Sequence, residues 1–262
     1  MKILLTLLLL IGLSSTQAES IKFNNQTVDI YIKATPAPTI LYIPGCNGLD
    51  DFGKKYQKFH QEEFAKVFPD ANFVVVQITN DITKGAKNGR CFWNDQTDER
   101  LKSYQSFHQA EYIVNLGNFI KTQPWSNGDI HVFGFSYGGR IGLWLNSTTL
   151  GKPDVFKSVS LIWPFCKGRF YPLGNIHTPT RIWATEKDPL SDAWNCHSYY
   201  SGNKNLLTVT LYEGANHSWF THPSLDGVSV EWPIHRVQVY SKFDQTLFDK
   251  TMIDWKTWID QL

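Results

Sequence analysis

Short hydrophobic runs alternate along the chain with longer stretches in which apolar residues recur at helical spacing. The short runs predict β-strands over residues 28–32, 39–43, 72–78, 130–133, 155–163, 180–185 and 206–212. The helical spacing predicts α-helices over residues 54–68, 101–122, 140–145 and 244–262. Most of these strands are apolar on both faces, as a parallel sheet covered by helices requires. The pattern therefore predicts an α/β fold with a mainly parallel central sheet and helices on both faces.

Two segments depart from this regular alternation. Residues 28–32 form a short alternating run, which predicts a strand at the edge of the sheet. Residues 221–240 show no clear periodicity and are predicted to be irregular, and the pattern leaves open whether they act as a lid. No repeat, low-complexity tract or linker divides the remainder, so residues 19–262 are predicted to form a single domain.

The first 18 residues have the pattern of a signal peptide. Lys2 is followed by an apolar run over residues 3–13 and then by small residues that end at Ala18. The run is too short to cross a bilayer comfortably, so we expect cleavage after Ala18 and no stable membrane insertion afterwards. This predicts an exported protein, either periplasmic or secreted, with a retained anchor as the alternative.

Charge and cysteine content narrow the possible functions. The 262 residues include 25 Lys and Arg and 24 Asp and Glu, a net charge of +1 that gives no electrostatic case for nucleic-acid binding. The four cysteines, at positions 46, 91, 166 and 196, form no Cys-x-x-Cys pair, which disfavours zinc or thioredoxin-like chemistry. In an oxidising compartment they predict two disulfides, for which the sequence allows three pairings.

The chemistry centres on a Gly-x-Ser-x-Gly motif between a predicted strand and a predicted helix. Gly134 and Gly138 flank Ser136, so side chains are absent where a sharp strand-to-helix turn brings backbone segments close together. Such a turn presents the serine hydroxyl at a helix N-terminus, where the helix dipole favours developing negative charge. We therefore predict that Ser136 is a nucleophile if a base and an acid follow it.

Candidates for the acid and the base lie after later predicted strands, with the acid before the base. Asp188 follows the strand over 180–185, where Glu186 and Asp192 are competing carboxylates. His217 follows the last strand. In a parallel sheet these strand ends meet at one edge, and the chain order Ser, acid, His is that of the α/β-hydrolases.

Other histidines fit this arrangement less well. His177, His222 and His235 are weaker candidates than His217, because none of them directly follows a strong strand.

Each residue type has a defined role in that chemistry. Ser136 needs a base to accept its proton, which His217 can do near neutral pH, and Asp188 would orient the imidazole. The backbone N–H of Tyr137 is one candidate donor to an oxyanion. The second is expected from the loop over residues 44–48, with the N–H of Cys46 favoured and that of residue 47 next.

The ordered segments resemble the dienelactone hydrolase family, in particular its exported, cysteine-containing relatives. The resemblance lies in residues 41–48, 89–91, 134–139, 163–166, 186–188 with the cysteine at 196, and 212–220. It spans nearly the whole mature chain, and it implies an α/β-hydrolase fold. It also implies that Ser136, Asp188 and His217 form the catalytic triad, which favours Asp188 over Glu186.

The same resemblance has implications for the cysteines and the substrate. It implies the disulfides Cys46–Cys91 and Cys166–Cys196, each joining a loop at the proposed site to a neighbour. Position 136 is Ser, whereas the enzymes that act on dienelactone use a Cys nucleophile. Pro44 also replaces the histidine usual in the oxyanion loop. Dienelactone is therefore not the expected substrate.

These observations predict an exported serine hydrolase that cleaves a small-molecule carboxylic ester through an acyl-enzyme. The mechanism requires neither a metal ion nor an organic cofactor. One alternative is a peptidase or polyester depolymerase on the same fold. Two others are a non-catalytic α/β-hydrolase-like binding protein and a thiol-based redox protein that uses Cys46.

Overall fold

An eight-stranded sheet forms the centre of the molecule, with the strand order β1-β2-β4-β3-β5-β6-β7-β8. The computed structural model describes residues 18–24, 26–45, 51–76, 99–146, 150, 153–164, 166, 176–186, 188, 195–196, 204–225, 229–232, 237–240 and 242–262. The strands of this sheet are β1 (Ala18–Phe23), β2 (Gln26–Tyr31), β3 (Ala37–Ile43), β4 (Asn72–Val76), β5 (Ser126–Phe135), β6 (Ser158–Ile162), β7 (Thr180–Thr185) and β8 (Leu207–Tyr212).

The central strands of the sheet are parallel, as the mostly apolar sequences of the predicted strands indicate. β4, β3, β5, β6, β7 and β8 pair in parallel, whereas β2 is antiparallel to β4 and β1 is antiparallel to β2. In this register Ile43 lies opposite Gly134, and Phe135 lies opposite Ile162. The carboxyl ends of β3, β5 and β6 therefore meet at the same edge.

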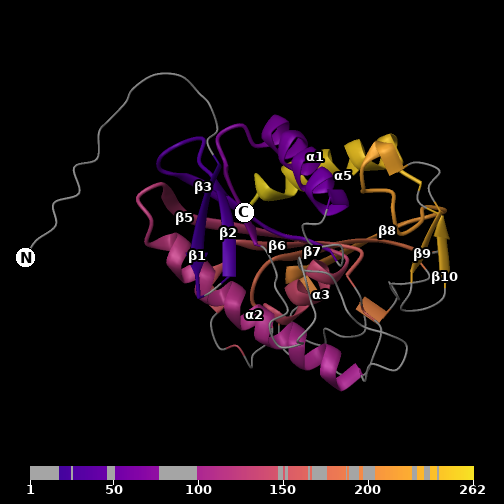
Figure 1. Cartoon of the computed structure of the whole chain (residues 1–262), viewed down its shortest axis with the longest axis horizontal. Coiled ribbons are helices and arrows are strands. Elements are labelled where there is room, and N and C mark those ends of the chain that lie inside the picture. The colour runs from indigo at the N-terminus through magenta and orange to yellow at the C-terminus, as the bar shows by residue number, and fades with distance from the viewer. Residues whose placement is uncertain are drawn as a thin grey trace, which may run out of the picture.

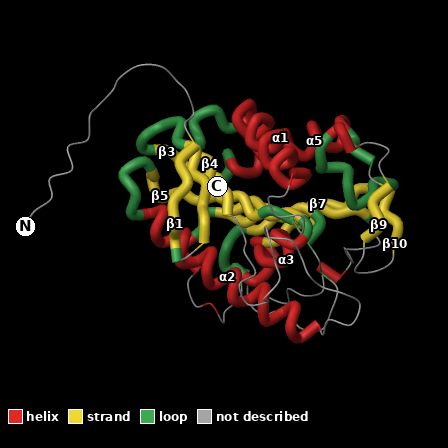
Figure 2. The backbone as a smooth tube through the Cα atoms, in the orientation of Figure 1, coloured by secondary structure: helices red, strands yellow, loops and turns green. Residues whose placement is uncertain are grey.

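Helices cover both faces of the sheet (Figures 1 and 2). Their bounds are α1 (Asp51–Val67), α2 (Glu99–Lys121), α3 (Tyr137–Trp144) and α5 (Gln245–Ile259). α1 and α5 lie on one face, and α2 and α3 lie on the other. Short 3₁₀ segments lie at Pro153–Val155, Lys204–Leu206 and Pro223–Leu225.

Alternation along the strands produces two hydrophobic cores. In β3, Leu41 and Ile43 join the cluster that contains residues of α2 and α3, whereas Ile40 and Tyr42 join the cluster of α1 and α5. The second cluster is rich in aromatic rings, among them Trp255 of α5. Because a fully buried large apolar side chain contributes about 1.5–3 kcal/mol, both cores fix the helices firmly against the strands.

The structure corrects two predictions about secondary structure. The strand predicted at the sheet edge, β2, lies one strand inside it, because β1 pairs along its outer side. The segment 221–240 was predicted to be irregular, but it contains the antiparallel pair β9 (Ser229–Trp232) and β10 (Val237–Tyr240). The strands that the sequence pattern did not predict, β1, β9 and β10, are all short.

The first described residue, Ala18, already belongs to the sheet. It lies opposite Tyr31 in the β1–β2 pair, so the strand begins at the residue after which cleavage is predicted. The preceding leader residues lie outside the described part of the chain. Among the described residues, no helix has both the length and the apolar character needed to cross a bilayer.

Candidate active site

Ser136 occupies the tight turn between β5 and α3. Its backbone has φ 52° and ψ −116°, a strained conformation for a residue with a side chain. Its N–H donates to the carbonyl of Ile162 at 2.8 Å, which ties the turn to the neighbouring strand. A Cβ at Gly138 would lie 2.1 Å from the carbonyl oxygen of Ile43, and one at Gly134 would lie 2.6 Å from that of Gly138. Both glycines are therefore required by close backbone contacts.

The hydroxyl of Ser136 belongs to a hydrogen-bonded array with the side chains of His217 and Asp188, which the sequence predicted as its partners. Its Oγ lies 3.3 Å from Nε2 of His217, and Nδ1 of His217 lies 2.5 Å from Oδ2 of Asp188. All three residues are buried, at 8%, 4% and 8% exposure respectively. A carboxylate oxygen accepts, so Nδ1 carries a proton and Nε2 can accept one from the serine.

The parallel sheet brings the three residues to one edge. Asp188 lies shortly after β7, and His217 lies shortly after β8. The N–H of Glu186 donates to the carbonyl of Tyr212 at 3.3 Å, which joins the starts of the two loops. Within the second loop, Oδ1 of Asn216 accepts from the N–H of Ser218 at 2.9 Å. These bonds hold the acid and the base at fixed positions relative to each other.

The competing side chains lie elsewhere or outside the described residues. The side chain of Glu186 is exposed, and Asp192 lies outside the described part of the chain. His222 hydrogen-bonds locally to Ser224 at 2.8 Å, and residue 235 is also outside the described part. The structure thus brings together Ser136, His217 and Asp188.

The expected oxyanion donors are only partly described. The N–H of Tyr137 lies in the first turn of α3, directly after Ser136. Gly45 lies close to the serine, since a Cβ built on it would be 3.3 Å from Cβ of Ser136. Cys46 and Asn47, which follow it, lie outside the described residues.

The side chain of Tyr137 is directed to the core rather than to the serine. The residue is 2% exposed, and burial raises the pKa of its phenol well above the ordinary value of 10. Hydrogen bonding with Ser106 and Gln109 of α2 opposes that rise in pKa. The phenol therefore anchors the first turn of α3, and only the backbone of Tyr137 is available for an oxyanion.

An indole ring packs against the imidazole of His217. The indole of Trp163 lies 4.8 Å away between ring centroids, at an interplanar angle of 34°. Trp219 and Phe135 pack edge-on against the same indole. Sequence reasoning missed this use of Trp163, because nothing in the pattern distinguishes it from a strand-end core residue.

A disulfide joins two segments beside the array. Cys166 and Cys196 are bonded, with Cα atoms 5.2 Å apart. This is one of the two pairs that the family resemblance implies. It connects the segment after β6 to the segment after Asp188. The other pair, Cys46 and Cys91, lies outside the described residues.

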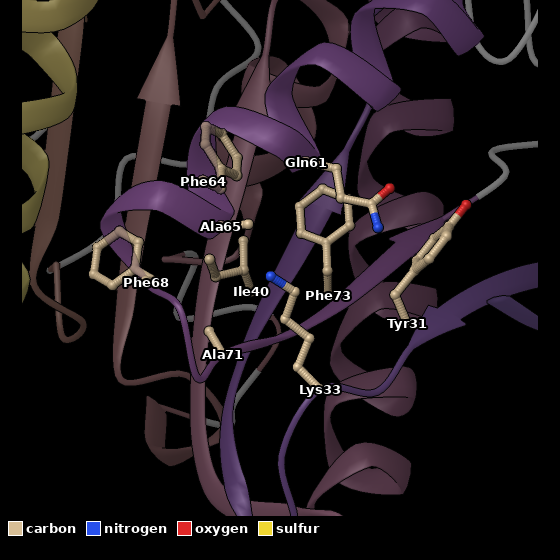
Figure 3. Close-up of a pocket in the computed structure, with 9 residues that line it drawn as sticks. All are labelled: Tyr31, Lys33, Ile40, Gln61, Phe64, Ala65, Phe68, Ala71 and Phe73. Carbon is tan, nitrogen blue, oxygen red and sulfur yellow. The ribbon is translucent and has the colours of Figure 1, made fainter. Parts of the chain in front are cut away.

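A separate, small hollow lies at the other end of the sheet (Figure 3). Its lining residues come from the starts of β3 and β4, the end of β2 and the last turns of α1, and they are Tyr31, Lys33, Ile40, Gln61, Phe64, Ala65, Phe68, Ala71 and Phe73. The serine array lies at the carboxyl ends of the strands, so the hollow is not part of the candidate site. Within the described ranges, no group of three or more His, Cys, Asp or Glu side chains is arranged to hold a metal ion.

Solved structures with the same arrangement of strands and helices belong to α/β-hydrolases. A dienelactone hydrolase-like promiscuous phosphotriesterase from metagenomic libraries aligns with a TM-score of 0.66 and 14% identity, over 94% of this chain and 98% of that chain. Esterase PE8 aligns with a TM-score of 0.58 and 13% identity, over 87% and 96%. A fungal esterase from Rhizomucor miehei aligns with a TM-score of 0.57 and 12% identity, over 96% and 84%.

Sequence comparison adds no closer relative. No protein-family model matches the chain, and no curated protein matches it. At identities of 12–14% the structural likeness establishes the architecture and not the reaction. The chain has the α/β-hydrolase fold, as its sequence predicted.

Proposed function

We propose that this chain is a serine hydrolase that cleaves a small-molecule carboxylic ester through an acyl-enzyme. One observation carries the proposal: the buried chain of hydrogen bonds from Ser136 through His217 to Asp188. The strained turn supports it, because backbone strain at this strand-to-helix corner is a cost that a merely structural serine does not require.

Acylation begins when Oγ of Ser136 bonds to the carbonyl carbon of the ester. The hydroxyl proton passes to Nε2 of His217, and the carbonyl π electrons move to oxygen. Asp188 accepts the hydrogen bond from Nδ1 and stabilises the imidazolium. The C–O bond to the alcohol then breaks, and the leaving oxygen takes the proton back from Nε2.

Deacylation repeats these steps with water as the nucleophile. His217 removes a proton from water as the water oxygen bonds to the acyl carbon. The bond between that carbon and Oγ of Ser136 then breaks, and His217 returns the proton to Oγ. In both halves the negative oxygen would accept hydrogen bonds from the N–H groups of Tyr137 and Cys46. Removing one such donor typically raises the barrier by about 3–4 kcal/mol.

We also propose that the protein is exported. Residues 1–18 would act as the signal peptide, and residues 19–262 as the single mature domain. The Cys166–Cys196 disulfide supports this, because stable disulfides are common in oxidising compartments and rare in the cytosol. Cleavage after Ala18 would remove one terminal residue of β1 and leave the rest of that strand in place.

The experiment that tests the function is labelling of the purified mature protein with a fluorophosphonate probe, which reacts with activated serines. We expect the wild type to label, Ser136→Ala to be silent, and His217→Ala to label at least about 1,000-fold more slowly. A folded wild type that does not label would reject the hydrolase and favour a non-catalytic binding protein. Labelling that persists in Ser136→Ala would place the nucleophile elsewhere.

A further inference from the structure

Trp163 has a backbone conformation that bulky residues rarely adopt. Its φ is 44°, and the described residues contain just two other non-glycine residues with positive φ, Asn24 and Ser136. Asn24 lies in the turn between β1 and β2, where asparagine tolerates this conformation. Ser136 and Trp163 instead follow directly on the adjacent strands β5 and β6. An outlier of this kind beside a reactive array calls for a functional explanation.

The strained backbone places the indole against one face of the His217 imidazole. The centroids are 4.8 Å apart and the planes are inclined by 34°. The backbone is held in place because the N–H of Trp163 donates to the carbonyl of Trp183 at 2.9 Å. The indole is 1% exposed, so its contact with the imidazole is shielded from solvent.

Two further rings prevent the indole from turning away. Phe135 and Trp219 meet it edge-to-face, at interplanar angles of 82° and 88° and centroid distances of 6.0 and 6.1 Å. Edge-to-face packing is a favoured geometry for aromatic rings. The indole therefore presents a fixed π face to His217.

The contact bears on the proposed proton transfer. His217 is held at Nδ1 by Asp188 and reaches Ser136 through Nε2, so both ring nitrogens are engaged and Trp163 meets the ring at its face. The negative face of an indole attracts a cation within about 6 Å of its centroid. It would thus favour the imidazolium that forms as the serine attacks, and would also limit rotation of the ring away from Ser136.

We propose that Trp163 is a positioning residue that acts through His217, an inference that rests on the proposed function. Its ring face holds the imidazole in line with Ser136 and stabilises the imidazolium formed during acylation. The effect should therefore appear in the chemical step rather than in the initial binding of a reagent.

The test compares Trp163→Phe with Trp163→Leu in the fluorophosphonate reaction, measuring the maximal inactivation rate and the half-saturating probe concentration separately. Both variants lose bulk and the indole N–H, but Phe keeps a π face. We expect Leu to lower the maximal rate about 10-fold and Phe to keep it within about 3-fold of wild type. The half-saturating concentration should change little in either variant.

Trp255 provides a matched control. It is also fully buried, and it packs against Phe64 and Phe133 in the core formed by α1 and α5. Trp255→Phe and Trp255→Leu lose the same atoms and should lower the urea midpoint without separating in inactivation rate. Equal rates for the two Trp163 variants would overturn the inference while leaving the hydrolase proposal intact. A wild type that fails to label would instead reject the proposed function itself.

Discussion

His60 of α1 is hydrogen-bonded to the backbone carbonyl of Phe220, three residues beyond His217. Nε2 of the imidazole lies 2.8 Å from that carbonyl oxygen, and Nδ1 lies 2.8 Å from the hydroxyl of Tyr42. Since a carbonyl only accepts, Nε2 carries the proton, and Nδ1 accepts from the tyrosine. His60 thereby links α1 and β3 to the turn that follows the proposed catalytic base.

This neutral, buried histidine predicts that the fold is sensitive to acid. Burial lowers the pKa of His60 from 6.5 to about 4. Between those values the unfolded chain binds more protons than the folded chain, so stability falls as pH falls through this interval. His60 alone should account for a loss of about 3 kcal/mol in the free energy of unfolding, measured in urea from pH 7 to pH 4.

His60→Gln should flatten part of that pH dependence, because the amide can donate to Phe220 and accept from Tyr42 without titrating. His131 is a second contributor, since burial lowers its pKa to about 4 and its Nδ1 lies 2.9 Å from the hydroxyl of Ser158. His131→Gln should remove a similar part of the pH dependence of stability, and the double variant should remove more than either single variant. If the free energy of unfolding of His60→Gln depended on pH as steeply as that of wild type, His60 would not be a source of the acid sensitivity.

A second prediction separates Asp188 from the neighbouring carboxylate. Asp188→Asn should reduce the labelling rate by about 10,000-fold, because an amide cannot fix the required imidazole tautomer. Glu186→Gln is the matched change on an exposed side chain two residues earlier, and it should leave the rate within about 2-fold of wild type. Circular dichroism would show that both variants remain folded. A large loss in the Glu186 variant and none in the Asp188 variant would reverse the assignment.

Most of the sheet could be predicted from sequence because its central strands are buried on both faces. Runs such as residues 40–43 and 73–76 are continuous and apolar, which is typical of strands in a parallel sheet covered on both faces. β1 could not be recognised in this way, because only Ile21 and Phe23 of its residues pack against the hydrophobic core. β9 and β10 are four residues long, which is the shortest length over which alternation can indicate a strand.

The part of the candidate site that follows from the order of residues along the chain could be predicted. Ser136, Asp188 and His217 each follow a strand, and a parallel sheet brings such positions together without further information. The roles of Trp163 and His60 depend on contacts between distant segments. Positive φ at a tryptophan, or a histidine that reaches a carbonyl 160 positions away, leaves no local signal in the sequence.

The disulfide predicts a third measurable effect. Cys166 and Cys196 are separated by 30 positions, and closing a loop of that length should stabilise the fold by about 3–4 kcal/mol. The double variant Cys166→Ser, Cys196→Ser should therefore have a lower urea midpoint than wild type. Because the bond also restrains the segment after Asp188, the labelling rate should fall in the folded variant.

Reductant provides the control for that experiment. Treatment with dithiothreitol should lower the urea midpoint of wild type toward that of the double variant. The same treatment should lower the midpoint of the double variant only by the contribution of any bond between Cys46 and Cys91. Equal urea midpoints for wild type and the double variant would show that the bond does not stabilise the fold.

Two glycines of α3 allow a final prediction about the turn itself. A Cβ at Gly138 would lie 2.1 Å from the backbone oxygen of Ile43, whereas a Cβ at Gly142 would lie 2.3 Å from the end of the Leu161 side chain. A side chain can rotate away, but the backbone at the end of β3 can move only by displacing Gly45 from Ser136. Gly138→Ala should therefore reduce the labelling rate by about 100-fold and the free energy of unfolding by about 3 kcal/mol.

Gly142→Ala is the matched control. Its gain in helix propensity, about 1 kcal/mol, offsets part of the clash with Leu161, and labelling should stay within about 3-fold of wild type. Similar losses in both variants would show that general overpacking of α3, rather than the contact between the turn and β3, limits the reaction.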